Sequence, residues 1–502
     1  MNDMMQIARI VPRVGAILGC AVLALGCEAV ITDPVQLEAG RVSVGDVTAS
    51  GVRVYRGLPF AAPPIGDNRW RAPQPVVPWD GVRDGSVFGN VCIQADTRPR
   101  YINIANMEGS PALSEDCLYL NVWTSAGTTS DKAPVMVFFY GGAFTDGGGA
   151  PPLYDGTALA ERGAVVVTMN YRLGSFGFLA HPELTAESGY NSSGNYGILD
   201  MVASLEWVQD NIEAFGGDSD NVTVFGQSAG AMAITSLMTS PLADGLFHRA
   251  IAQSIMGGAA SPNGPNATLA AQEQAGARAA EQAGLTSLAA MRALPANEVL
   301  TTLRANTMIV DNYVIPEDPA IVFAEGRHNE VDVLMGGNFA DLAFGGGGPP
   351  DPANNASDRV FWVARRIAEY AREAGQEAWV YWFARNGAGS EDFLPVHAAE
   401  VKYVFDNLGE IPLFPDSSDA ARIAASEADQ RLADTMASYW VNFARTGDPN
   451  GDDLPAWPAH TGLDRINGAI LDTDPGSKTL PTAASMRTLD QGLQTQLEAL
   501  AN

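Results

Sequence analysis

The sequence predicts an α/β fold with a large, mostly parallel central sheet that carries helices on both faces. Apolar, β-rich runs alternate along the chain with segments of helical periodicity, an order typical of α/β proteins. The chain has 502 residues and 46% of them are hydrophobic, so it can bury an ample core. No internal repeat and no clear linker divides it, and we expect residues 30–502 to form a single domain with inserted loops and helices.

Six apolar runs are the candidate central strands, at residues 134–140, 164–170, 222–225, 331–336, 378–385 and 469–472. Helices are expected where apolar residues recur with the 3.6-residue period. The expected helices cover residues 195–213, 229–238, 267–283, 358–374 and 420–445. This alternation of the two kinds of segment is the basis of the predicted sheet with helices on both faces.

The N-terminal segment has the features of an export signal. Arg9 and Arg13 precede an apolar run over residues 14–26, which is too short to cross a membrane comfortably. Cleavage before Cys27 would give a lipoprotein attached to the membrane through that cysteine, and cleavage after Ala29 would release a soluble protein. A buried N-terminal helix is the remaining alternative. We expect residues 1–29 to be a signal and the mature protein to be periplasmic, secreted or lipid-anchored in a bacterial cell envelope.

Cysteine content and net charge narrow the function classes. Cys92 and Cys117 are the two cysteines beyond the signal segment, and their number suits one disulfide in an oxidising compartment, with two separate buried thiols as the alternative. The net charge of −28 would be repelled by phosphate backbones. A nucleic-acid partner is therefore not expected.

A candidate nucleophile lies in the stretch TVFGQSAGAM, residues 223–232. Ser228 is flanked there by Gly226 and Gly230 in a G-x-S-x-G pattern. An apolar run precedes the pattern and a helical segment follows it, so a tight strand-to-helix turn would raise the serine hydroxyl clear of the backbone. The pattern is weak by itself, because a catalytic serine also needs a base, an acid and donors for an oxyanion.

An acid and a base follow two later strands. Asp341 comes just past the run 331–336, and His397 follows the run 378–385 after an excursion. The order Ser228, Asp341, His397 is that of α/β-hydrolases, and each residue would lie at the carboxyl edge of the sheet. Histidine supplies a base with a pKa near neutrality, and the acid fixes its tautomer. Asp318 and Asp332 are the alternative acids.

A glycine-rich turn supplies candidate oxyanion donors. The stretch FFYGGAF, residues 138–144, follows an apolar strand and contains Gly141, Gly142 and Ala143, whose backbone N–H groups can approach a ligand closely. An ordinary turn is the alternative. Together with Ser228, the strand followed by glycines matches the donor loop of lipases and esterases.

Several longer motifs resemble the type B carboxylesterases, the carboxylesterase/cholinesterase family of α/β-hydrolases. They are YRGLPFAAPPIGDNRWRAPQP at 55–75, SEDCLYLNVW at 114–123, NYRLGSFGFL at 170–179, GNYGILDMVASLEWVQDNIEAFGGDSDNVTVFGQSAG at 194–230, LFHRAIAQS at 246–254 and YWVNFARTGDPN at 439–450. The resemblance implies the α/β-hydrolase fold and hydrolysis of a small-molecule or polymeric carboxylic ester through an acyl-enzyme, with no metal or cofactor.

The resemblance also implies roles for individual residues. The nucleophile is Ser228, the acid Asp341 and the base His397. The remaining assignments are the oxyanion donors Gly142, Ala143 and Ala229, the disulfide Cys92–Cys117, and the substrate-pocket residues Tyr140, Phe144 and Gln227.

The sequence departs from the family pattern at two site positions. The family acid is usually Glu, where this chain has Asp341, and the residue before the nucleophile is usually Glu, where this chain has Gln227. The loop between Cys92 and Cys117 holds no tryptophan to bind a quaternary ammonium, so choline esters are not the expected substrates. A neuroligin-like binding or adhesion protein is the alternative from another class, and a lipase or polyester hydrolase is the alternative among enzymes. The sequence does not specify an oligomeric state.

Overall fold

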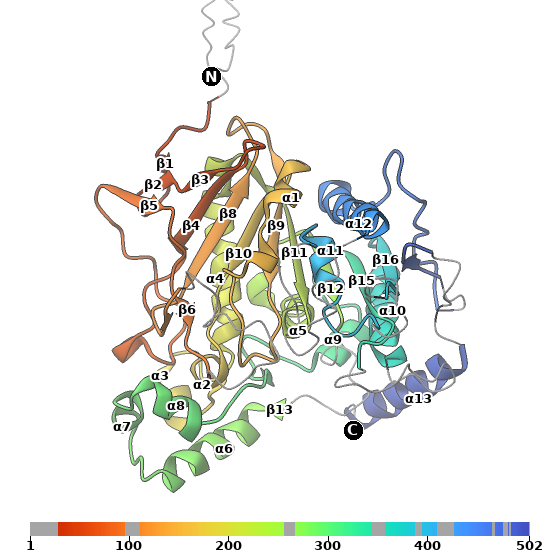
Figure 1. Ribbon diagram of the computed structural model, residues 1–502. Coiled ribbons are helices and arrows are strands. Elements are labelled where there is room, and N and C mark those ends of the chain that lie inside the picture. Colours follow the sequence, from red (N-terminus) through yellow and green to blue (C-terminus); the bar gives the residue numbers. More distant parts are fainter. Residues whose placement is uncertain are drawn as a thin grey trace, which may run out of the picture.

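The computed structural model describes residues 29–95, 111–255, 267–342, 357–386, 394–408, 426–463, 467–474, 480 and 483–500. The predicted signal segment up to residue 28, with Cys27, lies outside the described residues. A ten-stranded sheet runs through the centre of the molecule, with helices on both sides (Figure 1).

The sheet is parallel over most of its width. Its strands in spatial order are β17 (Ala469–Leu471), β16 (Ala378–Phe383), β15 (Asp332–Asn338), β12 (Arg249–Gln253), β11 (Gly217–Gln227), β9 (Ala133–Phe139), β10 (Val165–Met169), β8 (Tyr119–Thr124), β4 (Arg53–Pro59) and β3 (Asp46–Val47). Neighbours from β17 to β10 pair in parallel, and the pairs β10–β8, β8–β4 and β4–β3 are antiparallel. The prediction of a large, mostly parallel sheet is confirmed.

All six predicted central strands are present, as β9, β10, β11, β15, β16 and β17. The central strand β12 was not predicted, because its sequence RAIAQ contains a single β-branched residue and gives a weak strand signal. The strands β3, β4 and β8 on the antiparallel side were not predicted either.

Helices pack against the sheet in groups. The helix α4 (Tyr196–Asn211) contacts α5 (Ala229–Leu237), and α5 packs against β11 and β12. The helix α12 (Glu427–Thr446) packs against β9 and β11 and contacts α1 (Thr157–Glu161) and α11 (Val401–Val404). A third helix, α10 (Asp358–Glu373), covers β15 and β16.

The five predicted helices are present as α4, α5, α6 (Leu269–Gln282), α10 and α12. Residues 420–425 of the last predicted helix lie outside the described residues. Shorter helices gather beyond the lower end of the sheet in Figure 1: α2 (Gly174–Phe178), α3 (Pro182–Glu187), α7 (Leu288–Arg292) and α8 (Ala296–Thr302). The other helices are α9 (Pro319–Ala324) and α13 (Ala483–Leu500). The small sheets are formed by β1 (Val35–Gln36), β2 (Arg41–Val44) and β5 (Val82–Gly85), by β6 (Val91–Cys92) and β7 (Leu113–Ser114), and by β13 (Ala267–Thr268) and β14 (Ile309–Val310).

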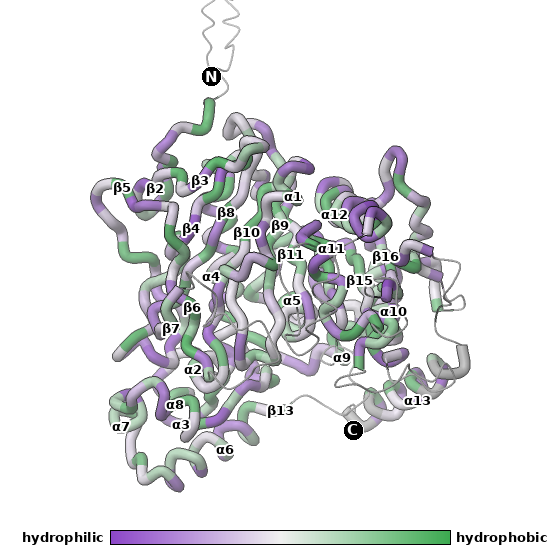
Figure 2. The backbone as a smooth tube through the Cα atoms, in the orientation of Figure 1, coloured by the Kyte–Doolittle hydropathy of each residue, from purple (hydrophilic) through white to green (hydrophobic). Residues whose placement is uncertain are grey.

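The core lies along the central strands, where hydrophobic residues concentrate, whereas polar residues gather on outer elements such as α12 (Figure 2). The Phe138 ring on β9 packs against Phe225 on β11 and against Phe405 after α11, with centroids 4.9 and 5.0 Å apart. Strands buried on both faces hold the carboxyl edge of the sheet in a fixed arrangement. The loops that leave β9, β11, β15 and β16 begin at this edge.

Two further findings concern the disulfide and the membrane. Cys92 and Cys117 form a disulfide with their Cα atoms 4.8 Å apart, which confirms the predicted pair. Across the described ranges, no helix is long and apolar enough to cross a membrane.

Candidate active site

Ser228 lies on a strained turn between β11 and α5. Its backbone has φ 56° and ψ −118°, which a non-glycine residue adopts only where the surroundings enforce it. Gly230 explains how the turn fits, because a Cβ at that position would lie 1.9 Å from the carbonyl oxygen of Phe139 at the end of β9. Only glycine lets α5 start this close to the neighbouring strand, so the local sequence dictates the turn that presents the serine.

The serine is held at the sheet edge from both sides. Its backbone N–H donates to the carbonyl oxygen of Gln253 at the end of β12, with an N···O distance of 2.9 Å. Ala229 is the first residue of α5, so its N–H is one of the donors that a helix leaves without an intrahelical acceptor. The Ser228 hydroxyl therefore lies beside a backbone donor at a helix N-terminus, where negative charge is favoured.

Asp341 and His397 are joined by a direct hydrogen bond. The Nδ1 atom of His397 donates to Oδ1 of Asp341, and Oδ2 of Asp341 accepts from the backbone N–H of Asn338 at 2.8 Å. The two loops also bond through their backbones, since the Ala340 N–H donates to the carbonyl oxygen of Pro395 at 3.2 Å. Both oxygens of the Asp341 carboxylate thus accept hydrogen bonds in a fully buried corner.

The surroundings of His397 raise its pKa despite the burial of the ring. Burial works against the imidazolium, but the charge of Asp341, the hydrogen bond that the ring donates to Asp341 and the charge of Glu400 raise the pKa of His397 above its ordinary value. A base whose cationic form is supported in this way is suited to hold a proton during a reaction.

The second ring nitrogen of His397 contacts the residue next to the serine. Its Nε2 lies 3.1 Å from Nε2 of Gln227, and because Nδ1 donates to Asp341, the Gln227 amide is the donor in this contact. Within the described ranges no hydrogen bond joins the Ser228 hydroxyl to His397. The contact shows that the serine turn and the histidine loop meet at one corner of the sheet.

The turn after β9 lies against the serine. A Cβ at Gly141 would lie 2.9 Å from the Ser228 Cβ, which places this turn directly beside Ser228. Gly142 has φ 118° and Ala143 has φ 54°, and the Gly142 carbonyl accepts from the N–H groups of Thr145 and Asp146 at 2.9 and 3.2 Å. In the described part of the chain, the N–H groups of Gly142 and Ala143 donate to no acceptor, so they are free to bind an oxyanion.

The three predicted pocket residues have different surroundings. Tyr140 is fully buried, its ring stacks on Tyr171 at 4.4 Å, and burial raises its pKa. Phe144 is buried against Phe178 at 4.9 Å. Tyr140 and Phe144 are therefore packed into the core through their rings, and Gln227 contacts His397.

The alternative acids lie elsewhere. Asp318 caps the N-terminus of α9 by accepting from the N–H of Ala320 at 3.0 Å. Asp332 lies at the start of β15 and forms an ion pair with Arg249 at 3.6 Å. Of the three candidate acids, Asp341 is the one that contacts His397.

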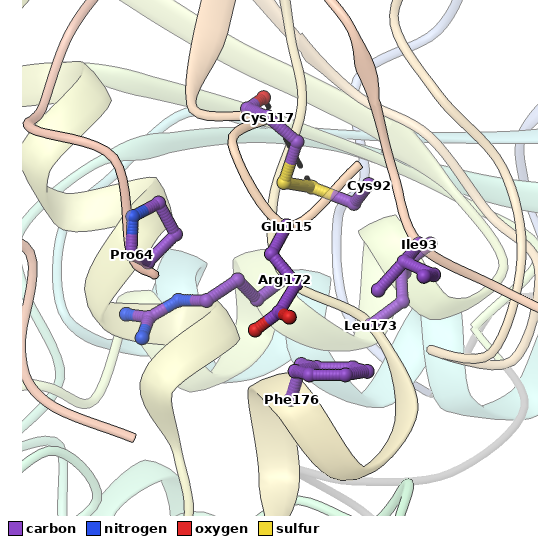
Figure 3. Close-up of a pocket in the computed structure, with 8 residues that line it drawn as sticks. All are labelled: Pro64, Cys92, Ile93, Glu115, Cys117, Arg172, Leu173 and Phe176. Carbon is purple, nitrogen blue, oxygen red and sulfur yellow. Dashed lines mark hydrogen bonds between the residues drawn. A yellow bond between two sulfur atoms is a disulfide. The ribbon is translucent and has the colours of Figure 1, made fainter. Parts of the chain in front are cut away.

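A small pocket beside the disulfide is separate from these residues (Figure 3). It is lined by Pro64, Cys92, Ile93, Glu115, Cys117, Arg172, Leu173 and Phe176. Its charged groups already have internal partners, since Arg172 pairs with Asp200 at 2.7 Å and Glu115 pairs with Arg69 at 2.6 Å. These ion pairs account for the polar groups of the pocket as parts of the scaffold.

Sequence reasoning missed one polar group behind the candidate site. Glu400 is fully buried three residues after His397 and contacts Asn338 and Gln253. Its signal was a glutamate in the mostly apolar stretch after His397, which also contains Lys402.

Comparisons with known proteins agree with this arrangement. Residues 32–345 and 353–488 match the model of the carboxylesterase family. The chain is 40% identical to fumonisin B1 esterase of Sphingopyxis macrogoltabida, over 81% of each protein. It is 34% identical to para-nitrobenzyl esterase of Bacillus subtilis, over 83% of this chain and 91% of that protein.

Solved structures of esterases have the same fold. A PNB esterase structure superposes with a TM-score of 0.75 at 29% identity, covering 91% of this chain and 99% of that one. A carboxylesterase of Geobacillus stearothermophilus gives a TM-score of 0.73 at 31% identity, covering 88% of this chain and 96% of that one. The chain has the α/β-hydrolase fold, belongs to the carboxylesterase family and is an ester-hydrolysing enzyme.

Proposed function

We propose that the protein hydrolyses carboxylic esters through an acyl-enzyme on Ser228, with His397 as general base and Asp341 as the acid that orients it. The observation that carries the proposal is the contact of 3.1 Å between Gln227 and His397. It brings the residue beside the strained serine against a histidine that is already bonded to a buried carboxylate. Nucleophile, base and acid are thereby gathered at one corner of the sheet, as a triad requires.

The reaction follows from this geometry. The Ser228 hydroxyl displaces the Gln227 amide at Nε2 of His397, which leaves the ring to take the hydroxyl proton as the oxygen attacks the ester carbonyl. Catalytic hydrogen bonds often tighten only when substrate is bound. The lack of a hydrogen bond between the Ser228 hydroxyl and His397 among the described residues fits that behaviour. His397 then gives the proton to the departing alcohol. In the second half of the reaction His397 takes a proton from water as the water attacks the acyl group, and returns it to the departing Ser228 oxygen, which releases the acid.

The developing oxyanion is held by backbone donors. Gly142 and Ala143 supply N–H groups from the turn after β9, and Ala229 supplies one from the first turn of α5. The turn lies against the Ser228 Cβ position, so a carbonyl carbon bonded to the serine would place its oxygen between the two sources of donors. Each such donor typically contributes roughly 3 kcal/mol to stabilising the transition state.

A series of substrates distinguishes the candidate substrate classes. Relatives are named for fumonisin B1 and for para-nitrobenzyl esters. A lipase or polyester hydrolase differs from a general carboxylesterase in the chain lengths it accepts, so a series of p-nitrophenyl esters from acetate to palmitate separates these classes. A neuroligin-like binding role is disfavoured, because such members of the family have lost the nucleophile and this chain has Ser228.

We also propose that residues 1–29 direct export and that residues 30–502 form the mature domain, as a soluble protein or anchored through a lipidated Cys27. The disulfide between Cys92 and Cys117 supports an oxidising compartment.

The proposed role of Ser228 is tested by Ser228→Ala with p-nitrophenyl acetate as substrate. The variant should fold and retain less than about 1% of the wild-type rate, because removal of a triad member costs several orders of magnitude. Ser254→Ala is the matched control, since Ser254 is a buried serine at the end of β12 whose hydroxyl has no hydrogen-bond partner among the described residues. A Ser228→Ala variant that is as active as Ser254→Ala and wild type would reject the mechanism.

A further inference from the structure

Glu400 is a buried carboxylate that the triad chemistry does not use. Its side chain has no exposed surface, and no arginine or lysine of the described ranges forms a salt bridge with it. Its Oε2 accepts from the side-chain amide of Asn338, and its Oε1 accepts from Nε2 of Gln253 at 3.3 Å. A carboxylate buried without a cationic partner destabilises the fold, so its retention next to the proposed catalytic histidine suggests a function in the site.

Asn338 connects Glu400 to both loops of the site. Its backbone N–H donates to Oδ2 of Asp341 at 2.8 Å, and its side-chain amide donates both to Glu400 and, at 2.8 Å, to the carbonyl oxygen of Val396. Val396 directly precedes His397. One residue at the end of β15 thus binds the acid, the backbone beside the base, and the buried Glu400, and the carboxylate fixes the orientation of its amide.

The charged and titratable groups around Glu400 come from four elements. Asp341 follows β15, and His397 lies three residues before Glu400 in the same loop. Tyr381 lies on β16, and Tyr154 lies in the short helical turn Pro152–Tyr154. Burial raises the pKa of both tyrosines, so they stay neutral at working pH. The remaining neighbours are uncharged: β12 presents Gln253, whose side-chain oxygen accepts from Nε1 of Trp440 on α12.

Charge on Glu400 therefore acts mainly on the Asp341–His397 pair. Burial and the nearby Asp341 carboxylate raise the pKa of Glu400 to about 7, and the charge of Glu400 in turn favours the protonated form of His397.

We propose that Glu400 is a positioning residue of the active site: through Asn338 its carboxylate holds Asp341 and the backbone at His397 in place, and its negative charge supports the imidazolium that forms on His397. It touches neither substrate nor the reacting atoms, and no proton leaves or reaches it during turnover. The role rests on the proposed function, because it acts on the base of that mechanism.

Two substitutions separate the two parts of this role. Glu400→Gln keeps an oxygen that can accept from Asn338 but removes the charge, and its NH₂ group replaces the oxygen that accepts from Gln253. Glu400→Asp keeps the charge but shortens the side chain, so the bond to Asn338 is weakened. Glu369→Gln is the matched control, because Glu369 is another buried glutamate that contacts a histidine, His460, at 3.1 Å and lies outside the active site.

The readouts are kcat, KM and the pH profile of kcat/KM for p-nitrophenyl acetate, with folding checked by thermal melting. Glu400→Gln should move the acidic limb to lower pH by about 0.5–1 unit, because the imidazolium loses a stabilising charge. It should lower kcat at high pH on the order of tenfold with KM changed by less than about twofold, as expected for support felt only in the transition state. Glu400→Asp should lower kcat while its acidic limb stays at the wild-type pH.

A folded Glu400→Gln variant with an unchanged acidic limb and kcat would overturn the proposal, as would the same limb shift in Glu369→Gln. If Glu400→Gln does not fold, Glu400→Asp decides alone, and an unchanged kcat in that variant overturns the positioning role. Failure of the mechanism itself is distinguishable, because it would appear as activity remaining in Ser228→Ala whatever the Glu400 variants do.

Discussion

Asp341→Asn is the substitution whose effect the structure constrains most closely. Both oxygens of the Asp341 carboxylate accept hydrogen bonds, one from His397 and one from the backbone N–H of Asn338. An asparagine has one oxygen and one NH₂ group, so it can serve only one of these donors. If the NH₂ group faced Asn338, two donors would meet in a fully buried corner, at a cost of about 1–3 kcal/mol.

The asparagine oxygen should therefore stay on the Asn338 N–H and turn the NH₂ group toward His397. Nδ1 of His397 then becomes an acceptor and its proton moves to Nε2, which leaves no lone pair to take the proton of Ser228. The imidazolium also loses its carboxylate. We expect kcat to fall on the order of 10⁴-fold, about 5 kcal/mol in activation free energy, with the fold retained.

The assay is hydrolysis of p-nitrophenyl acetate at pH 8, with protein concentration set by absorbance and folding checked by circular dichroism. Asp318→Asn is the control, because Asp318 is a buried N-cap of α9 and asparagine caps a helix about as well as aspartate. A kcat within about threefold of wild type in Asp341→Asn would refute the assignment of the acid, since a wrong tautomer cannot be that active.

Three further outcomes are expected. Gln227→Glu places a negative charge beside Nε2 of His397, which should raise the pKa of the ring. The acidic limb of the pH profile of kcat/KM should then move to higher pH, and an unchanged limb would count against the contact between Gln227 and His397. Gly230→Ala forces a Cβ against the carbonyl of Phe139, so the melting temperature and the yield of active enzyme should both fall in a thermal-shift and activity comparison, and an unchanged protein would contradict the close packing of α5. The intact mass after export from a Gram-negative host should show loss of the first 26–29 residues, with a diacylglyceryl group if Cys27 is the new N-terminus. Retention of the full chain would contradict the export proposal.

The alternation of segments in the sequence was enough to predict the central sheet, because long apolar strands and amphipathic helices carry strong periodic signals. The strand β12 was not predicted, because its sequence RAIAQ has one β-branched residue. Its place in the sheet is set by β11 and β15 on either side. The small strands and short helices likewise depend on tertiary neighbours more than on their own sequence.

The candidate site was predicted as far as its residue types and chain order allow. Ser228, Asp341 and His397 each follow a strand that the sequence marks, and the structure brings the serine turn, the aspartate and the histidine to one corner. The hydrogen-bond arrangement could not be predicted, because it depends on how loops some 60 residues apart meet: Asn338 bonds Val396 and Glu400 across separations of 58 and 62 residues. The occupation of Nε2 of His397 by Gln227 is likewise a product of this packing.

The central claim is that Ser228 becomes acylated, and the most direct test is to trap the intermediate. Enzyme mixed with excess p-nitrophenyl acetate and quenched in acid within milliseconds is digested, and the peptides are measured by mass spectrometry. The account predicts an added acetyl group on the peptide that contains Ser228, together with a burst of p-nitrophenolate equal to the enzyme present. Acetyl groups found only on other residues, or steady hydrolysis without any acyl-enzyme in an active sample, would contradict it.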